Sequence, residues 1–337
     1  RVFQAFASPY SPGCHVRAPL AVVSSVEALE AAEISGSIIL LHGEIASQQL
    51  MPKNFPFYNP DGHKRIIQLL ESKNPRAIIA ATSRDMEMVG SMYPFPLIED
   101  GDFDIPSVYM TDEEGKSLAA YAGKEILLES RATRIPASGC NVIARKRGWS
   151  NRRIVLFAHI DAKMNTPGAS DNASGVIVLL LLAQLLEGYT GSTGIEIAAI
   201  NGEDYFSNPG EQQYIALNEG KFAEIILGIN IDGAGYYRGN TAYTLYDCPP
   251  PMVRVIDSTF SCSTEFVQGE CWYQGDHGIF LLNQRPALAI TSELAAELMA
   301  EITHTPKDCP EIIDTRKLAT LALVLRETLL QVNHAVA

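Results

Sequence analysis

Side chains that could bind a metal ion and activate water occur in five short segments of the second half of the chain. Each segment follows an expected strand or begins the helix after it. The groups are His159 and Asp161, Asp171, Glu203 and Asp204, Asp232, and His304. In a mostly parallel sheet, sites form beyond the carboxyl ends of the strands, which share one edge. We therefore expect these seven side chains to converge there.

Taken singly, each group has an ordinary explanation. Asp171 before a helix is by default an N-cap, because its carboxylate can accept from free backbone amides. Glu203 and Asp204 could be a solvated loop, and Asp232 before Gly233 a turn. Together, however, several carboxylates at one sheet edge would raise each other's pKa. A divalent metal removes that repulsion, and two histidines with three aspartates form the mixed nitrogen and oxygen set that zinc accepts.

The elements that must position these groups alternate between strand and helix from about residue 139 onward. Apolar runs predict buried strands at 153–158, 195–200, 224–231 and 286–290. Helical spacing and helix-start signals predict helices at 171–186, 210–219, 249–260 and 315–334. Such alternation indicates an α/β fold with a mostly parallel sheet and helices on both faces.

The first half has a different character. Short apolar runs with turn signals predict strands at 36–42, 76–81, 105–109 and 125–129, and helices at 64–72 and 111–122. This half is rich in proline and glycine and brings no histidine and carboxylate set together. His42, His63 and Glu44 are interpreted as solvated. We therefore interpret it as an accessory module.

The second half resembles the zinc exopeptidase family that contains bacterial secreted aminopeptidases, glutamate carboxypeptidases and glutaminyl cyclases. The resemblance covers about 200 residues. It rests on HxD at 159–161, GASDNASG at 168–175, NGED at 201–204, NIDGAG at 230–235, GDHGIF at 275–280 and HTPKD at 304–308. It implies the phosphorylase/hydrolase-like fold of the zinc exopeptidases and metal-dependent hydrolysis of peptide bonds at chain ends.

The resemblance also implies two zinc ions per chain. Asp171 would bridge them, His159 and Asp232 would complete one site, and Asp204 and His304 the other. Many relatives carry glutamate where this chain has Asp204, whose shorter side chain draws that ligand toward the backbone. Zinc is implied by the family and the ligand types, and manganese or cobalt are alternatives.

Two residues are assigned to catalysis by the same resemblance. Glu203 would be the general base and then acid, and Asp161 would orient the ring of His159 through its second nitrogen. Tyr236 and Tyr237 could line the substrate pocket, with packing an equally good explanation.

The first half resembles a protease-associated domain, on its strand pattern around GSIILLHG and on FDIPSVYMTDEEG at 103–115. We predict an accessory domain at 17–132 and a catalytic zinc exopeptidase domain at 133–337. Residues 1–16 are unassigned, and one alternative is that they cross back to the catalytic domain.

We favour an aminopeptidase among the members of this family. A carboxypeptidase or dipeptidase would use the same metals and clamp a terminal carboxylate, for which Arg238 and Arg285 are candidates. A glutaminyl cyclase is disfavoured because it uses one zinc. From another class, a non-catalytic binding module on the same fold is disfavoured because all five ligand positions and the base are retained.

Composition narrows the remaining possibilities. The 337 residues are 47% hydrophobic and 19% charged, which is typical of a folded globular protein. The net charge is −13 and we identify no cluster of lysine and arginine, so we expect no nucleic-acid or anionic-membrane partner. Peptide substrates are implied by the family resemblance. The longest apolar run, 176–186, is too short to cross a bilayer. Cys262 and Cys271 are close enough in sequence to close a loop, and a secreted or periplasmic location is favoured over the cytoplasm. The oligomeric state stays open.

Overall fold

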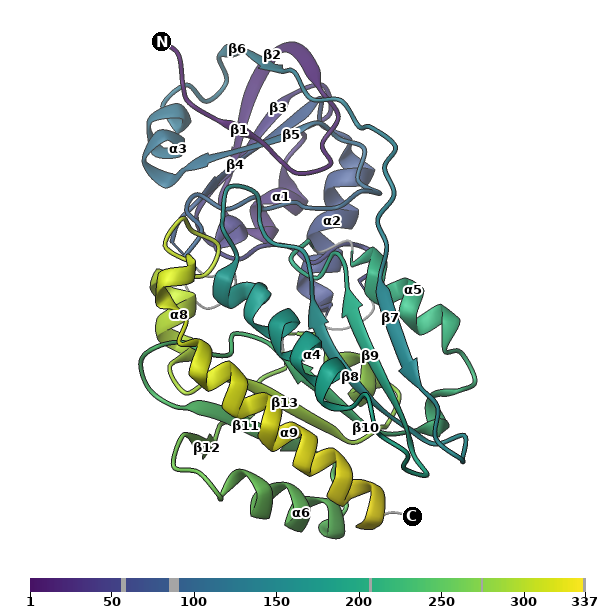
Figure 1. Ribbon diagram of the computed structural model, residues 1–337. Helices are drawn as coiled ribbons and strands as arrows, with labels where there is room; N and C mark the ends of the chain where they lie inside the picture. The colour runs from purple at the N-terminus through teal and green to yellow at the C-terminus, as the bar shows by residue number, and fades with distance from the viewer. Residues whose placement is uncertain (56–58, 85–90, 206–207, 274, 336–337) are drawn as a thin grey trace. The chain divides into compact units, whose positions relative to one another are not determined.

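The computed structural model describes residues 1–55, 59–84, 91–205, 208–273 and 275–335 (Figure 1). It forms two compact units that divide between Ser138 and Gly139. Each unit is built on its own twisted sheet, and each is considered separately.

The first unit has a six-stranded sheet in the order β1-β5-β4-β3-β2-β6. Its central pairs, from β2 through β5, are parallel, and its two edge pairs are antiparallel. The strands are β1 (Phe6–Ala7), β2 (Cys14–Val23), β3 (Ile38–Leu41), β4 (Ala77–Thr82), β5 (Ser107–Thr111) and β6 (Glu125–Ser130). β4 is buried along its whole length, as expected for a central parallel strand covered on both faces.

Three helices accompany this sheet: α1 (Val26–Ala31), α2 (Asp61–Lys73) and α3 (Asp112–Ala119). α2 ends at Asn74, which adopts a left-handed conformation with φ 45°, a common way to terminate a helix. His63 on this helix is buried, and its Nδ1 accepts a hydrogen bond from the amide of Met51 at 3.2 Å. The interpretation of His63 as solvated was therefore wrong, because its ring is buried within the protein and bonded to the backbone.

The second unit has a seven-stranded sheet in the order β12-β11-β13-β10-β8-β9-β7. The four strands β13, β10, β8 and β9 are parallel, while β11 and β7 run antiparallel beside them. The strands are β7 (Val142–Lys146), β8 (Arg153–His159), β9 (Gly194–Ile200), β10 (Ile225–Ile231), β11 (Thr241–Tyr246), β12 (Phe266–Gln268) and β13 (Ala287–Ser292).

Helices cover both faces of this sheet. On one face α4 (Ser174–Leu185) and α6 (Pro250–Phe260) pack against α9 (Thr315–Ala335) over a core that includes Leu156 of β8. Phe157, the next residue, points to the opposite face because side chains alternate along a strand. It contacts Tyr214 of α5 (Pro209–Leu217) and Phe280 of α7 (Gly278–Leu282), with ring centroids 4.7 and 4.9 Å apart. The predicted α/β fold class is confirmed.

Some features of the second unit were not predicted. β7, β11 and β12, together with α7 and α8 (Ala295–Glu301), have no counterpart among the predicted elements. Cys262 and Cys271, which are close enough in sequence to close a loop, are both free and exposed. Among the described residues, no helix is long and apolar enough to span a membrane.

Candidate metal centre

Asp171 lies at the centre of the site, in a tight turn between β8 and α4. Its backbone has φ −117° and ψ 85°, and the helix begins only at Ser174. The expectation that Asp171 opens the helix was therefore wrong. The amides of Ser170 and Asp171 donate instead to the carboxylate of Asp308, at 2.7 and 3.1 Å. Because Asp308 accepts these hydrogen bonds, the carboxylate of Asp171 is available for other partners.

The two oxygens of Asp171 face two different histidines. Oδ1 lies 2.9 Å from His159 Nε2, and Oδ2 lies 3.2 Å from His304 Nε2. Asp232 Oδ1 is 3.7 Å from the same nitrogen of His159, while Asp204 Oδ1 is 2.8 Å from His304 Nε2. Within each triad, the three potential ligand atoms lie within 4.8 Å of one another. The structure thus brings the five predicted ligands together as two triads that share one carboxylate.

The donor set fits a divalent cation. His159 Nε2 and Asp204 Oδ2 are buried and lack a well-aligned hydrogen bond among the described residues, although Asp171 Oδ1 approaches His159 Nε2 to 2.9 Å as an ion pair. Buried polar atoms in proteins are otherwise nearly always hydrogen-bonded. Imidazole nitrogens and carboxylate oxygens are ligands that zinc accepts. A cation between these atoms would supply the missing partner.

Without a cation, the ionisable groups of the site compensate one another. Burial raises the pKa of Asp204, and the neighbouring charge of Asp171 raises it further. Burial alone would lower the pKa of His304, but its hydrogen bonds with Asp171 and Asp204 outweigh burial and raise that pKa to about 10. A protonated His304 then takes the role of counterion that a metal would otherwise have.

Glu203 lies beside the triads and belongs to none of the possible metal groups found among the described residues. Its Oε2 is 3.9 Å from His159 Nε2, beyond hydrogen-bond distance. Burial raises the pKa of Glu203 well above the usual carboxyl range, and the charges of Asp232 and Asp276 add to that rise. A carboxyl group so placed, close to the ligands but outside their set, can accept and return a proton at neutral pH.

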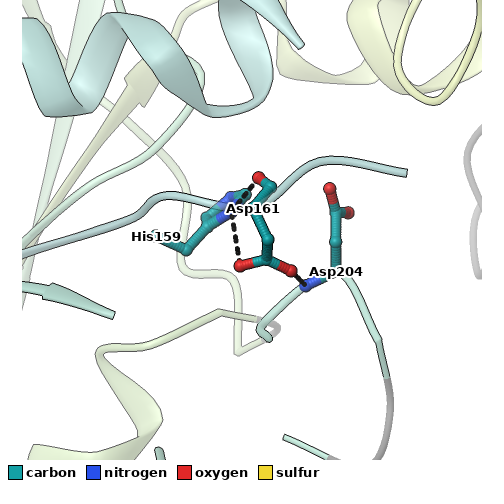
Figure 2. A group of neighbouring side chains, drawn as sticks. All are labelled: His159, Asp161 and Asp204. Atoms are coloured by element: carbon teal, nitrogen blue, oxygen red, sulfur yellow. Dashed lines mark hydrogen bonds and ion pairs between the residues drawn. The ribbon is translucent and has the colours of Figure 1, made fainter. Parts of the chain in front are cut away.

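Asp161 holds the loop that carries Glu203. Its carboxylate accepts hydrogen bonds from the amides of Gly202, Glu203 and Asp204, at 2.6, 3.2 and 3.1 Å. Figure 2 shows the bond from the Asp204 amide. His159 Nδ1 is 3.1 Å from the backbone carbonyl of Asp161 and 3.8 Å from its carboxylate. The nearest partner of the histidine ring is therefore the carbonyl, whereas the predicted partner was the side chain. Since the carboxylate is engaged by three amides, the third possible metal group, His159, Asp161 and Asp204, is the least suited to a cation.

The two tyrosines after Asp232 have different environments. Tyr236 is buried against Leu298 and Ile302, and its hydroxyl donates to Glu297 at 2.7 Å. Burial raises the pKa of Tyr236 to about 12, and the hydrogen bond to Glu297 contributes. Tyr237 is 56% exposed, so of the two only its side chain is open to a ligand.

Four further residues support the site and were not assigned from the sequence. Asp308 fixes the Asp171 turn, and the Asn172 amide donates to the carbonyl of Ile231 at 2.9 Å, which ties that turn to the end of β10. Asn172 and Asp308 lie inside the stretches that carry the family resemblance. Glu211 and Asp276 form a buried carboxyl pair near Glu203, and burial raises the pKa of Asp276 to about 6. No sequence pattern pointed to a role for Glu211 in the site, because acidic residues are common in the first turn of a helix.

Curated relatives are fungal aminopeptidases. A leucine aminopeptidase 2 from Trichophyton equinum is 29% identical over 154 residues, which cover 42% of this chain and 29% of the relative. A probable leucine aminopeptidase 2 from Aspergillus fumigatus is 25% identical over 308 residues, which cover 85% of this chain and 57% of the relative. The chain thus matches well under two thirds of the length of either protein.

Solved structures share the fold. A zinc aminopeptidase from Bacillus subtilis superimposes with a TM-score of 0.72 at 19% identity, covering 98% of this chain and 80% of that one. An aminopeptidase from Aneurinibacillus sp. strain AM-1 gives a TM-score of 0.67 at 21% identity, and the match covers 97% of this chain and 77% of that one. The family model of peptidase family M28 matches residues 141–329, more than half of the chain, and includes every ligand position of both triads. The chain therefore belongs to peptidase family M28.

Proposed function

We propose that the chain is a zinc-dependent aminopeptidase with two zinc ions in the centre described above. The observation that carries the proposal is the geometry of Asp171, which turns one carboxylate oxygen toward each of two histidines. His159 and Asp232 would complete one zinc site, and Asp204 and His304 the other. Manganese or cobalt would suit the same ligands, so zinc is favoured by the family relationship.

The residues of the chain divide the chemistry between them. When bound, zinc supplies Lewis acidity, which polarises a peptide carbonyl and lowers the pKa of water. Glu203 takes a proton from the attacking water and returns it to the leaving amine, so that the amine departs neutral. Asp161 keeps Glu203 in place through three backbone amides, and Asp308 does the same for Asp171.

An aminopeptidase is favoured over a carboxypeptidase or dipeptidase because the two candidate carboxylate clamps are poorly placed. The guanidinium of Arg238 forms an ion pair with Glu297. Arg285 lies just before β13, which is parallel to β10 and, through it, to β8. It therefore belongs to the amino edge of the sheet, opposite the site. A glutaminyl cyclase is disfavoured, since two triads indicate two metals.

We also propose that the first unit is a protease-associated accessory domain. Its support is the parallel arrangement of β2 to β5 and the motif at 103–115. Residues 1–16 lie with this unit, since β1 pairs with β5 in the first sheet. A secreted or periplasmic location remains part of the proposal.

The direct test is mass-spectrometric analysis of one short peptide in three forms: both ends free, the amino end blocked, and the carboxyl end blocked. Each form is incubated with the zinc-loaded chain, with and without a chelator. We expect stepwise loss of residues from the free amino end, abolished by amino blocking and by chelation, and unaffected by carboxyl blocking.

Other outcomes would redirect the assignment. Trimming from the carboxyl end, or cleavage of dipeptides alone, would keep the metal centre and overturn the aminopeptidase assignment. No cleavage of any form by a chain that contains zinc would favour a binding module on the same fold.

A further inference from the structure

The second unit carries a cavity far from the metal centre, at the amino ends of its central strands. Its volume is about 750 Å³. β8 begins in its wall at Arg153 and ends at His159 in the metal centre, so the two sites are separated by roughly 20 Å, the length of a seven-residue strand. The cavity is therefore a separate feature of the fold and takes no part in the proposed hydrolysis.

The cavity is strongly basic. Six cationic residues and only two carboxylates line it, in a chain whose net charge is −13. The cations are Arg145, Lys146, Arg147, Arg152, Arg153 and Lys221, and the carboxylates are Glu196 and Glu224. Five of the cations fall within residues 145–153. This concentration corrects the expectation that no stretch of the chain clusters lysine and arginine, on which the absence of a nucleic-acid or anionic-membrane partner was predicted.

Two of the arginines are held in fixed positions by the carboxylates. Arg145 Nε lies 2.5 Å from Glu196 Oε2, and the guanidinium of Arg153 lies 3.4 Å from the same oxygen and 2.5 Å from Glu224 Oε2. The side chain of Glu196 is fully buried and also accepts from the hydroxyl of Tyr214. These ion pairs lie in the wall of the cavity, and they neutralise both of the carboxylates that line it.

Lys146, Lys221 and Arg147 have no carboxylate partner among the described residues. Lys221 donates from Nζ to the backbone carbonyl of Leu217, a neutral acceptor in the cavity wall, whereas Lys146 donates to the carbonyl of Glu187, which is outside the lining. Arg147 is exposed at the turn after β7. The cavity therefore keeps an excess of positive charge, provided by the end of β7, by the turn that follows it, by the start of β8, and by the segment after α5 (Figure 1).

We propose that this cavity binds a small, multiply charged phosphate anion. Arginine guanidinium groups match phosphate oxygens with two parallel hydrogen bonds, and four of the six cations are arginines. The volume falls in the range of small-molecule sites. Because the cations come from several segments around a hollow, they can surround a compact anion, whereas a membrane or a nucleic acid needs a continuous basic surface.

The test is a calorimetric titration of the zinc-loaded full chain with inorganic tripolyphosphate at low salt. The test variant combines Arg147→Glu with Lys221→Glu, and the matched control combines Lys64→Glu with Arg254→Glu. All four side chains are exposed, and both variants change the net charge equally. The control also reports any removal of zinc by the anion. We expect saturable binding that weakens at least about tenfold in the test variant, as expected when strong charge-assisted contacts are lost, and stays within about twofold in the control.

Several results would overturn the proposal. These are no saturable binding, an equal loss of affinity in the two variants, or binding only to anionic phospholipid vesicles or only to duplex DNA. If the reversed charges prevent folding, Arg147→Ala with Lys221→Ala replaces them, and unchanged affinity in that variant would overturn the proposal equally. None of these results bears on the aminopeptidase assignment, which the peptide digest tests separately.

Discussion

The two sheets of this protein have parallel central strands, and polar residues follow those strands in both, but the polar residues act differently. In the first unit they are hydrogen-bonded locally. Ser25, after β2, accepts from the amide of Ala28, and Thr111, at the end of β5, accepts from the amide of Glu114. Both bonds cap the helix that follows. Thr82, at the end of β4, accepts from the amide of Phe95 and donates to its carbonyl.

In the second unit the corresponding positions do not cap helices. Asp171 lies before α4, but Asp308 accepts from the amides of its turn, and the carboxylate of Asp171 faces two histidines. His159, at the end of β8, and Asp204, in the loop after β9, each keep a buried atom that lacks a well-aligned hydrogen bond among the described residues. A polar residue after a strand is thus a candidate for metal binding when another residue has already satisfied the local backbone amides.

The largest expected effect comes from Glu203→Gln. The amide keeps nearly the same shape but cannot accept the proton from water. We therefore expect the rate of hydrolysis to fall by about three orders of magnitude or more, a loss typical of removing a general acid–base group. Zinc content should stay unchanged, because Glu203 lies outside both triads. Initial rates and metal analysis on the same preparation measure both quantities.

The matched control for Glu203→Gln is Glu44→Gln. Glu44 follows β3 of the first sheet and is exposed. The Glu44→Gln variant should leave both the rate of peptide hydrolysis and the zinc content unchanged. A Glu203→Gln variant that kept near-normal activity would remove Glu203 from the mechanism, and one that lost zinc would make it a ligand.

The next largest effect concerns pH and Asp276. Its pKa in the folded chain is raised to about 6 from 3.8, chiefly by burial. A raised pKa means that folding favours the protonated form, so the stabilisation is complete below the ordinary pKa and is lost as the pH rises through about 6. In the metal-free chain, Asp276→Asn should therefore gain up to about 3 kcal/mol in unfolding free energy relative to the parent between pH 4 and pH 8.

Urea unfolding at several pH values measures this difference. The control is Asp61→Asn, whose carboxylate is fully exposed and which should leave the pH profile of stability unchanged. Parallel profiles for the parent and Asp276→Asn would show that Asp276 ionises normally in the folded chain.

A smaller effect is expected for Asp308→Asn. An amide offers one acceptor oxygen in place of two, so one of the two amides in the Asp171 turn would lose its partner. Residues that orient metal ligands typically contribute 10- to 100-fold to metal affinity, and we expect a loss in that range, measured by competition with a chromogenic chelator.

Asp314→Asn is the control for this experiment. The Asp314 carboxylate also accepts from a backbone amide, that of Arg316 at 2.9 Å, but it holds no ligand turn. Unchanged zinc affinity in Asp308→Asn would show that the turn keeps its shape without this contact.

The sequence predicted much of this molecule because its central strands are continuous apolar runs. β8 and β10 lie within or beside the expected ranges, and the residues at their ends gather as predicted. β7 was missed because four of the five residues of this short edge strand are exposed and its last two, Arg145 and Lys146, are charged, so no apolar run marks it. The conformation of Asp171 was missed because it depends on Asp308, 137 residues away in sequence.

The smallest expected effect tests the first unit. Thr111→Ala removes the side chain that caps α3 and should lower the unfolding free energy by about 1 kcal/mol, whereas Thr111→Ser should keep most of it. Neither variant should change zinc content or peptide hydrolysis, because this hydroxyl is satisfied within its own helix turn. Urea unfolding and metal analysis of the full chain measure the two quantities. A loss of zinc content in Thr111→Ala would contradict this expectation. The polar residues at the strand ends of the first sheet could then not be treated as purely structural. The distinction between polar residues with and without a local hydrogen-bond partner would fail.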